Sequence, residues 1–193
     1  QVETRAASGA TRCKRSRKPR SAGGSWSGAN ANRPRRSSGA VVWFRPRAIT
    51  LTGPVTLTGD VVLDSDRFET GGANITVQGT IATAGKNLTL DAGSTGDLTF
   101  QSSVTGGGNL LVEQGDEQLF QAAVSVDNLT IQQATTSVTF AALVTVAQSA
   151  NINSLGTISQ NSTFVVGQDV IYSAVGAITV EDVLTAGNDV TLT

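Results

Sequence analysis

Carboxylates spaced twenty residues apart are the side chains of this sequence best suited to catalysis. Asp97 and Glu117 form one such pair, and Asp169 and Asp189 form another. Retaining glycosidases use two carboxyl groups about 5–5.5 Å apart. If the chain folds with a twenty-residue strand repeat, each pair lies about 5 Å apart on neighbouring strands. The pairs therefore predict an alternative carbohydrate site. The competing explanation is a turn carboxylate that recurs with the repeat.

A second acidic group lies in the stretch from Asp64 to Gly72. Asp64, Asp66 and Glu69 offer oxygen ligands of the kind that Ca²⁺ takes. Their spacing does not match an EF-hand loop, and Arg67 lies among them. These three residues are weak metal candidates, and a solvated loop is the alternative interpretation.

The scarcity of other residue types excludes most kinds of catalytic site. The chain has no His and a single Cys, Cys13, which removes the usual general base, an internal disulfide and a multi-Cys zinc site. A uronate lyase needs a basic residue beside its carboxylates, and the only basic residues after position 47 are Arg67 and Lys86. Both are far along the chain from Asp169 and Asp189, and we expect Lys86 at a different corner of the fold from Asp97. The sequence predicts a non-enzyme without a cofactor.

The elements that position these side chains follow a repeat. A short apolar–Thr–apolar pattern recurs at steps of 26, 23 and then 20 residues, which predicts a first set of strands, the A strands. They are Ile49–Leu51, Ile75–Val77, Leu98–Phe100, Gln118–Phe120, Val138–Phe140, Ile158–Gln160 and Ile178–Val180. The B strands follow at Val55–Leu57, Val104, Val124–Val126, Val144–Val146, Phe164–Val166 and Val183–Leu184. The C strands are Val61–Leu63, Leu88–Leu90, Leu110–Val112, Leu129–Ile131, Ala150–Ile152, Val170–Tyr172 and Val190–Leu192.

One such repeat cannot fold alone. Six buried aliphatic side chains supply roughly 9–18 kcal/mol, whereas ordering twenty residues costs about 20–40 kcal/mol of backbone entropy. Stacking on the repeats above and below must make up the difference. We therefore predict an all-β fold, a parallel β-helix (β-solenoid) of about seven coils of roughly 20 residues, with three short strands per coil. Phe100, Phe120 and Phe140 should form an internal ladder, and Asn87, Asn109 and Asn128 should lie at corners.

The repeats support a family resemblance. The segments Ala73–Ile81 and Lys86–Gly93 resemble those of filamentous-haemagglutinin-type and autotransporter-like bacterial adhesins. The resemblance implies a right-handed β-helix and a shaft segment of a large secreted or surface-displayed, outer-membrane-associated exoprotein. It also implies partners: neighbouring β-helix coils of the full-length protein, and host or environmental glycans or surfaces.

The two parts of the chain carry opposite charge. Residues 1–47 hold twelve of the fourteen basic residues and one acid, a net charge of +11, whereas residues 48–193 carry −12. We expect residues 1–40 to be a disordered basic segment, either a linker or an out-of-frame translation. Nucleic-acid binding is disfavoured because stacking aromatic residues are sparse there. No apolar run is long enough for a membrane span.

The expected boundary of the solenoid comes from one further repeat. Val41–Trp43 lies twenty residues before Val61–Leu63, so residues 41–193 form the predicted β-helix. We expect it to be a fragment of a longer solenoid.

Overall fold

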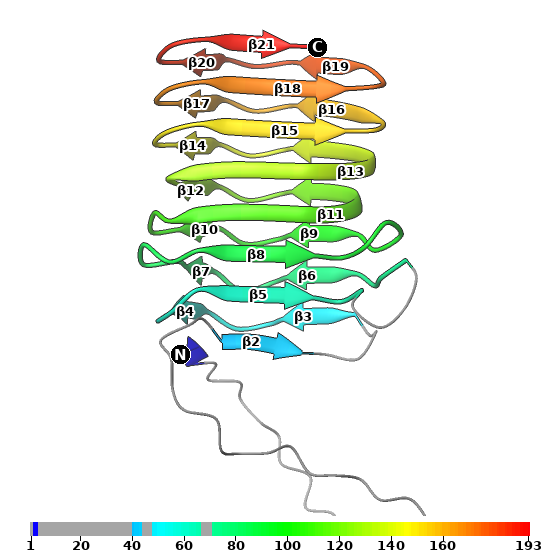
Figure 1. Cartoon of the computed structure of the whole chain (residues 1–193). Coiled ribbons are helices and arrows are strands. Elements are labelled where there is room, and N and C mark those ends of the chain that lie inside the picture. Colours follow the sequence, from blue (N-terminus) through cyan, green and yellow to red (C-terminus); the bar gives the residue numbers. More distant parts are fainter. Residues whose placement is uncertain (1, 4–39, 44–47, 67–70) are drawn as a thin grey trace, which may run out of the picture.

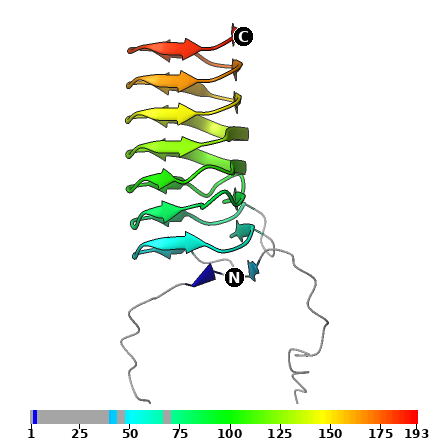
Figure 2. The same ribbon diagram turned by 90° about the vertical axis from the view of Figure 1, so that its left-hand side faces the viewer.

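The computed structural model describes residues 2–3, 40–43, 48–66 and 71–193. These residues form β-strands and turns, with no helix among them. The strands wind upward in stacked coils (Figure 1), and a view turned by 90° shows the coils as successive levels (Figure 2). Apart from one short strand at the amino terminus, all pairings are parallel, so the fold is the predicted parallel β-solenoid.

Three ladders of strands make up the walls. Ladder A contains β3 (Ile49–Leu51), β6 (Ile75–Val77), β9 (Leu98–Phe100), the second halves of β11 (Asn109–Phe120) and β13 (Asn128–Phe140), β16 (Thr157–Gln160) and β19 (Ile178–Val180). Ladder B contains β4 (Val55–Leu57), β7 (Ile81–Ala82), β10 (Val104–Thr105), β12 (Val124–Val126), β14 (Val144–Val146), β17 (Phe164–Val166) and β20 (Leu184–Ala186). Ladder C contains β2 (Ala40–Trp43), β5 (Val61–Asp64), β8 (Leu88–Asp91), the first halves of β11 and β13, β15 (Ala150–Ser154), β18 (Val170–Ala174) and β21 (Val190–Leu192).

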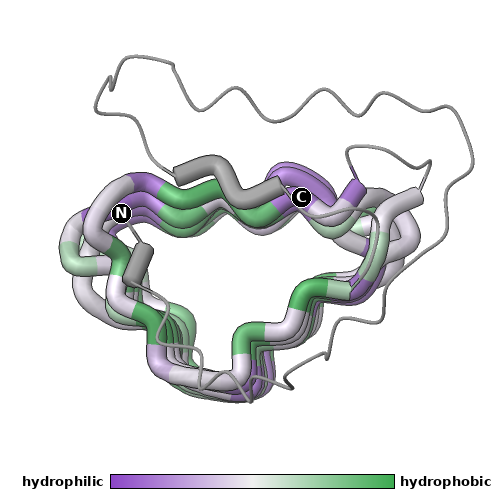
Figure 3. The backbone as a smooth tube through the Cα atoms, turned by 90° about the horizontal axis from the view of Figure 1, so that it is seen from below, coloured by the Kyte–Doolittle hydropathy of each residue, from purple (hydrophilic) through white to green (hydrophobic). Residues whose placement is uncertain are grey.

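The register follows the sequence repeat. In ladder A, residues pair in the order Ile49, Ile75, Leu98, Gln118, Val138, Ile158 and Ile178. These seven rungs correspond to six turns from first to last, close to the expected seven coils. Seen along the axis, the coils superpose in one roughly triangular outline (Figure 3).

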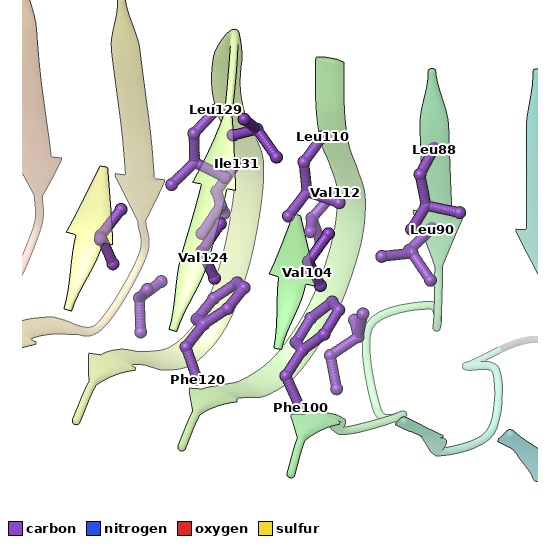
Figure 4. Packing of buried hydrophobic residues seen from close by; sticks show 14 of the residues in the cluster. Leu88, Leu90, Phe100, Val104, Leu110, Val112, Phe120, Val124, Leu129 and Ile131 are labelled. Carbon is purple, nitrogen blue, oxygen red and sulfur yellow. The ribbon is translucent and has the colours of Figure 1, made fainter. Parts of the chain in front are cut away.

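The core fills the space between the three ladders. Alternate residues of each strand point inward, because side chains in a strand alternate between faces, and they are buried along almost the whole stack. Side chains from successive coils lie side by side, as Figure 4 shows for Leu88, Leu110 and Leu129. The predicted aromatic ladder is confirmed. The rings of Phe100 and Phe120 stack with centroids 4.7 Å apart, and Phe140 continues the stack at 5.0 Å.

A buried polar cluster ends this aromatic column. Gln160 occupies the next position after Phe140 and is completely buried. Its Nε2 donates to the carbonyl oxygens of Asp182 and Val183, at 3.3 and 3.0 Å. Its Oε1 accepts from the Tyr172 hydroxyl at 3.2 Å. Each hydrogen-bonding group of the side chain therefore has a partner, which is what burying an amide requires.

The corners are closed by side-chain hydrogen bonds between coils. Asn128 Nδ2 donates to Asn109 Oδ1 at 2.8 Å, and the Asn109 backbone N–H donates to Asn87 Oδ1 at 3.2 Å. The predicted corner position of these asparagines is confirmed. The Asn87 and Asn128 side chains thus accept the backbone N–H groups of Asn109 and Ser149 in the next coil, at the start of ladder C.

The structure corrects several strand assignments. β11 and β13 run through the corner from ladder C to ladder A as single strands of 12 and 13 residues, so three short strands per coil is wrong there. β7 was not predicted, and β20 starts one residue after the predicted Val183. In β2, Val41 pairs with Val62 rather than with Val61 as the twenty-residue spacing implied. The pairing of β2 with β5 is therefore shifted by one residue from the predicted one.

The amino-terminal segment is described at only a few positions. β1 (Val2–Glu3) pairs antiparallel with β4. β2 begins at Ala40, one residue before the predicted boundary. The rest of the basic segment lies outside the described residues.

Candidate functional site

Three carboxylates meet at the corner where ladder C ends in the first coils. Asp64 ends β5 and Asp91 ends β8, and the two residues are register partners. Asp66 follows two residues after Asp64, in the turn beyond the strand. One oxygen atom from each of these three carboxylates lies within 4.8 Å of the others.

Backbone groups position these carboxylates. The Asp66 N–H donates to Asp64 Oδ1 at 3.1 Å, and the Gly93 N–H donates to Asp91 Oδ1 at 3.0 Å. Gly93 has a φ of +73°, and a Cβ there would lie 2.7 Å from Asp66 Cβ. Glycine thus permits the turn that brings the two neighbouring coils together at this corner.

Partial burial and the crowding of like charges raise the pKa of two carboxyl groups in this cluster. Partial burial raises the pKa of Asp66, and the negative charges of Asp91 and Asp64 raise it further. Partial burial also raises the pKa of Asp91; the Gly93 N–H opposes this rise, while the charges of Asp64 and Glu113 add to it. A bound cation would relieve the repulsion, and carboxylate oxygens are the ligands that Ca²⁺ takes.

The cluster only partly matches the metal candidates expected from the sequence. Asp64 and Asp66 are together, as predicted, whereas Glu69 lies outside the described residues. Asp91 was missed. The signal for it was present, because Asp91 follows the strand Leu88–Leu90 as Asp64 follows Val61–Leu63. Stacking these strands places the two carboxylates on one corner.

Asp97 and Glu117 lie on neighbouring coils, as the twenty-residue spacing predicts. The Glu117 N–H donates to Asp97 Oδ1 at 3.4 Å. Asp97 Oδ2 accepts from Asn74 Nδ2 at 3.1 Å, and the Asp97 N–H donates to Asn74 Oδ1 at 3.0 Å. Both oxygens of Asp97 therefore hold one coil to the next. A general acid or nucleophile would need at least one of them directed at a substrate.

Asp169 and Asp189 form a similar contact at the corner before ladder C. The Asp189 N–H donates to Asp169 Oδ1 at 3.3 Å, and the Val170 N–H donates to the Asp189 carbonyl at 2.9 Å. The structure brings each pair together but does not bring the two pairs to one site. Asp97 precedes β9, whereas Asp169 precedes β18, several coils further along.

Comparisons with protein-family models, with curated proteins and with solved structures found no match for this chain. In the part of the chain that the structure describes, no helix has the length and apolar character needed to cross a membrane.

Proposed function

We propose that this chain is a non-catalytic shaft segment of a large, secreted or surface-displayed bacterial adhesin-like exoprotein. The observation that carries the proposal is the in-register stacking of ladder A across seven rungs. A solenoid gains length at a constant cross-section, and each added coil covers the one before it. Such a rod holds binding regions at a distance from a cell.

The chemistry of the wall supports a mechanical role. Inward positions are nearly all apolar, with Gln118 and Gln160 as buried polar exceptions in ladder A. The outward residue of the same ladder is Thr in most coils, as at Thr50, Thr76 and Thr99. A regular apolar interior and a hydroxyl-bearing exterior stabilise a rod in water without requiring a ligand.

The resemblance of the repeats to filamentous-haemagglutinin-type adhesins gives the proposal its cellular setting. On this proposal the protein is outside the cell or associated with the outer membrane. Its partners are further β-helix coils of the same polypeptide and glycans or surfaces reached by the shaft.

The proposal is tested by locating the protein on the bacterium that produces it. An antibody raised against residues 48–193 should label intact cells, and external protease should remove the label. The control is a cytoplasmic protein detected only after lysis. Labelling confined to lysed cells would contradict the proposal.

The alternative is a β-helix that binds or degrades a polysaccharide. It is tested by replacing Asp97 with Asn and Glu117 with Gln, and by the same exchange at Asp169 and Asp189. On the shaft proposal, neither double variant changes sugar binding or cleavage, because the Asp97 and Asp169 carboxylates accept backbone N–H groups of the next coil. Loss of an otherwise measurable cleavage activity in either variant would favour the alternative.

A further inference from the structure

A surface groove lies where ladder C turns into ladder A, across β13, β15 and β18. Its volume is about 330 Å³, near the lower end of the usual range for ligand sites. Its polar lining includes Gln132, Gln133, Asn153 and Ser173, and its aliphatic lining includes Leu155 and Val175. No side chain that lines the groove is ionisable, although residues 48–193 carry a net charge of −12.

A β-bulge forms one end of this groove. Between Ile131 and Ala134, β13 has the two residues Gln132 and Gln133, whereas the paired segment of β15 has Asn153 alone. A bulge redirects side chains that a regular strand would place in alternation. Here it places two carboxamides in succession beside the Asn153 side chain.

The bulge is held from inside the core. Gln118 has only 1% of its surface exposed, in a column where its neighbours are Leu98 and Val138. Its Nε2 donates to the Gln133 carbonyl oxygen at 3.0 Å. The amide thus satisfies a carbonyl group at the irregular pairing, which gives a physical reason for a polar residue in an apolar column.

The groove presents polar groups that are available to a ligand. The side chains of Gln132 and Gln133 make no hydrogen bond to another described residue. Asn153 Nδ2 donates to the Ile131 carbonyl at 3.3 Å and to Asn151 Oδ1 at 3.2 Å, which leaves Asn153 Oδ1 as an acceptor. Ser173 is the register partner of Asn153 and adds a hydroxyl in the next coil.

An aliphatic wall flanks these polar groups. Leu155 and Val175 occupy corresponding corner positions in successive coils, with 53% and 81% of their surfaces exposed. Carboxamides can pair with an acetamido group through both N–H and C=O. The aliphatic side chains can cover its methyl group and the apolar face of a sugar ring.

We propose that this groove binds a neutral, N-acetylated saccharide. The carboxamides of Gln132 and Gln133 bind the acetamido group, Asn153 and Ser173 bind ring hydroxyls, and Leu155 and Val175 cover the apolar surface. This site is separate from the carboxylate pairs, and the shaft proposal does not depend on it.

The test uses the full chain and N,N′-diacetylchitobiose as the probe. Saturation-transfer NMR should detect binding with a Kd of about 1 mM, a typical strength for a small ligand in a shallow site. The Leu155 methyl resonances should shift on titration. Cellobiose, which has the same linkage without acetamido groups, should bind about ten-fold more weakly, since one lost hydrogen bond is worth roughly that factor.

Two variants decide the location. Gln132→Ala and Asn153→Ala should each weaken binding about ten-fold. Asn161→Ala should not, because Asn161 is an exposed amide at another corner of the same region. Circular dichroism checks that all three retain the β-sheet spectrum. The proposal is overturned if the probe does not bind, if cellobiose binds equally well, or if both groove variants bind like the unaltered chain.

Discussion

At the scale of single residues, this fold is most informative where a side chain departs from the apolar–Thr–apolar pattern. Asp64, Asp66 and Asp91 crowd like charges at one corner. Gln160 and Tyr172 place hydrogen-bonding groups in an apolar interior. In the first case the arrangement costs stability at neutral pH, and in the second the energetic cost is offset by mutual hydrogen bonding.

Asp66→Asn should stabilise the chain at pH 7. Because the pKa of Asp66 is raised in the folded state, the folded protein binds more protons than the unfolded one between its usual value of 3.8 and the raised value. Stability therefore falls as the pH rises through that interval. Since the side chain is only partly buried and solvent screens its charge, we expect a gain of only a few tenths to about 1 kcal/mol. Urea unfolding at pH 7 and pH 3 measures it.

The gain in the free energy of unfolding from Asp66→Asn should disappear at pH 3. At that pH the Asp66 side chain of the unaltered chain is protonated, so it is neutral like the Asn side chain of the variant. Glu181→Gln, at an exposed carboxylate in the last coil, should have little effect at either pH. Equal gains at both pH values would contradict the explanation by charge repulsion. Adding Ca²⁺ to the same proteins tests the sequence-based metal prediction, since an ion at the cluster would stabilise the unaltered chain more than the variant.

A double-mutant cycle measures the Gln160–Tyr172 contact. Gln160→Leu removes the acceptor of the Tyr172 hydroxyl and the donor to Asp182 and Val183, and should cost about 2–4 kcal/mol. Tyr172→Phe should cost about 1–2 kcal/mol. The double variant should lose about 1 kcal/mol less stability than the sum of the two single variants, because both substitutions remove the same hydrogen bond between Gln160 and Tyr172. Strict additivity in denaturant unfolding would show that the contact contributes nothing.

At the scale of elements, the corners between strands are the places where the fewest residue types fit. Gly85 and Gly108 both lie in turns before strands of ladder C, and both have positive φ, +75° and +74°. A Cβ at Gly85 would meet nothing within 4 Å, whereas one at Gly108 would overlap the Lys86 carbonyl oxygen. A substitution at Gly85 therefore tests the backbone strain of the turn alone. A substitution at Gly108 tests that strain together with the packing of one coil on the next.

Gly85→Ala should therefore cost about 1 kcal/mol, the penalty for a left-handed conformation with a Cβ. Gly108→Ala should cost about 2–4 kcal/mol, since a clash of the added Cβ with the Lys86 backbone in the adjacent coil adds to that strain. Thermal unfolding of the two variants beside the unaltered chain measures the difference. Equal destabilisation would mean that coil contact at this corner has no effect.

Strand positions and registers were predictable from the sequence because inward side chains alternate with outward ones over short, repeated segments. The A strand at Ile75–Val77 and the B strand at Val124–Val126 are examples in which the structure agrees residue for residue. The bulge at Gln132–Gln133 was not predictable, since two polar residues at a corner fit a loop equally well. Its geometry depends on the Gln118 amide, which comes from the preceding coil.

At the scale of the whole molecule, the coil is the unit that can be removed. Phe120 and Phe140 are register partners. Deleting residues 121–140 joins Phe120 to Ala141 and preserves every ladder. The shortened chain should fold with a β-sheet spectrum, shorter by about 4.8 Å, and with a lower urea m-value because less surface is buried. Small-angle scattering and urea unfolding measure both changes.

Deleting only residues 121–130 provides the control. This deletion removes the ladder B strand and most of the ladder C strand of one coil. The ladder A strand that ends at Phe120 would then be followed directly by the corner before the next ladder A strand, so the coil could not close. We expect loss of cooperative unfolding in this variant. If both deletions fold equally well, or neither folds, stability does not arise from coil-by-coil stacking as described.

The sequence by itself determined that the chain is a parallel β-solenoid with three ladders, because an inward–outward alternation repeated every twenty residues can bury its apolar side only against copies of itself. It also determined the order of residues in the aromatic column. Only the tertiary structure decided which polar groups meet. Asp91 joins Asp64 and Asp66, Tyr172 reaches Gln160, and Gln118 supports the bulge at Gln133. These contacts depend on side-chain direction and on one-residue shifts at corners, which the pattern of apolar residues does not encode.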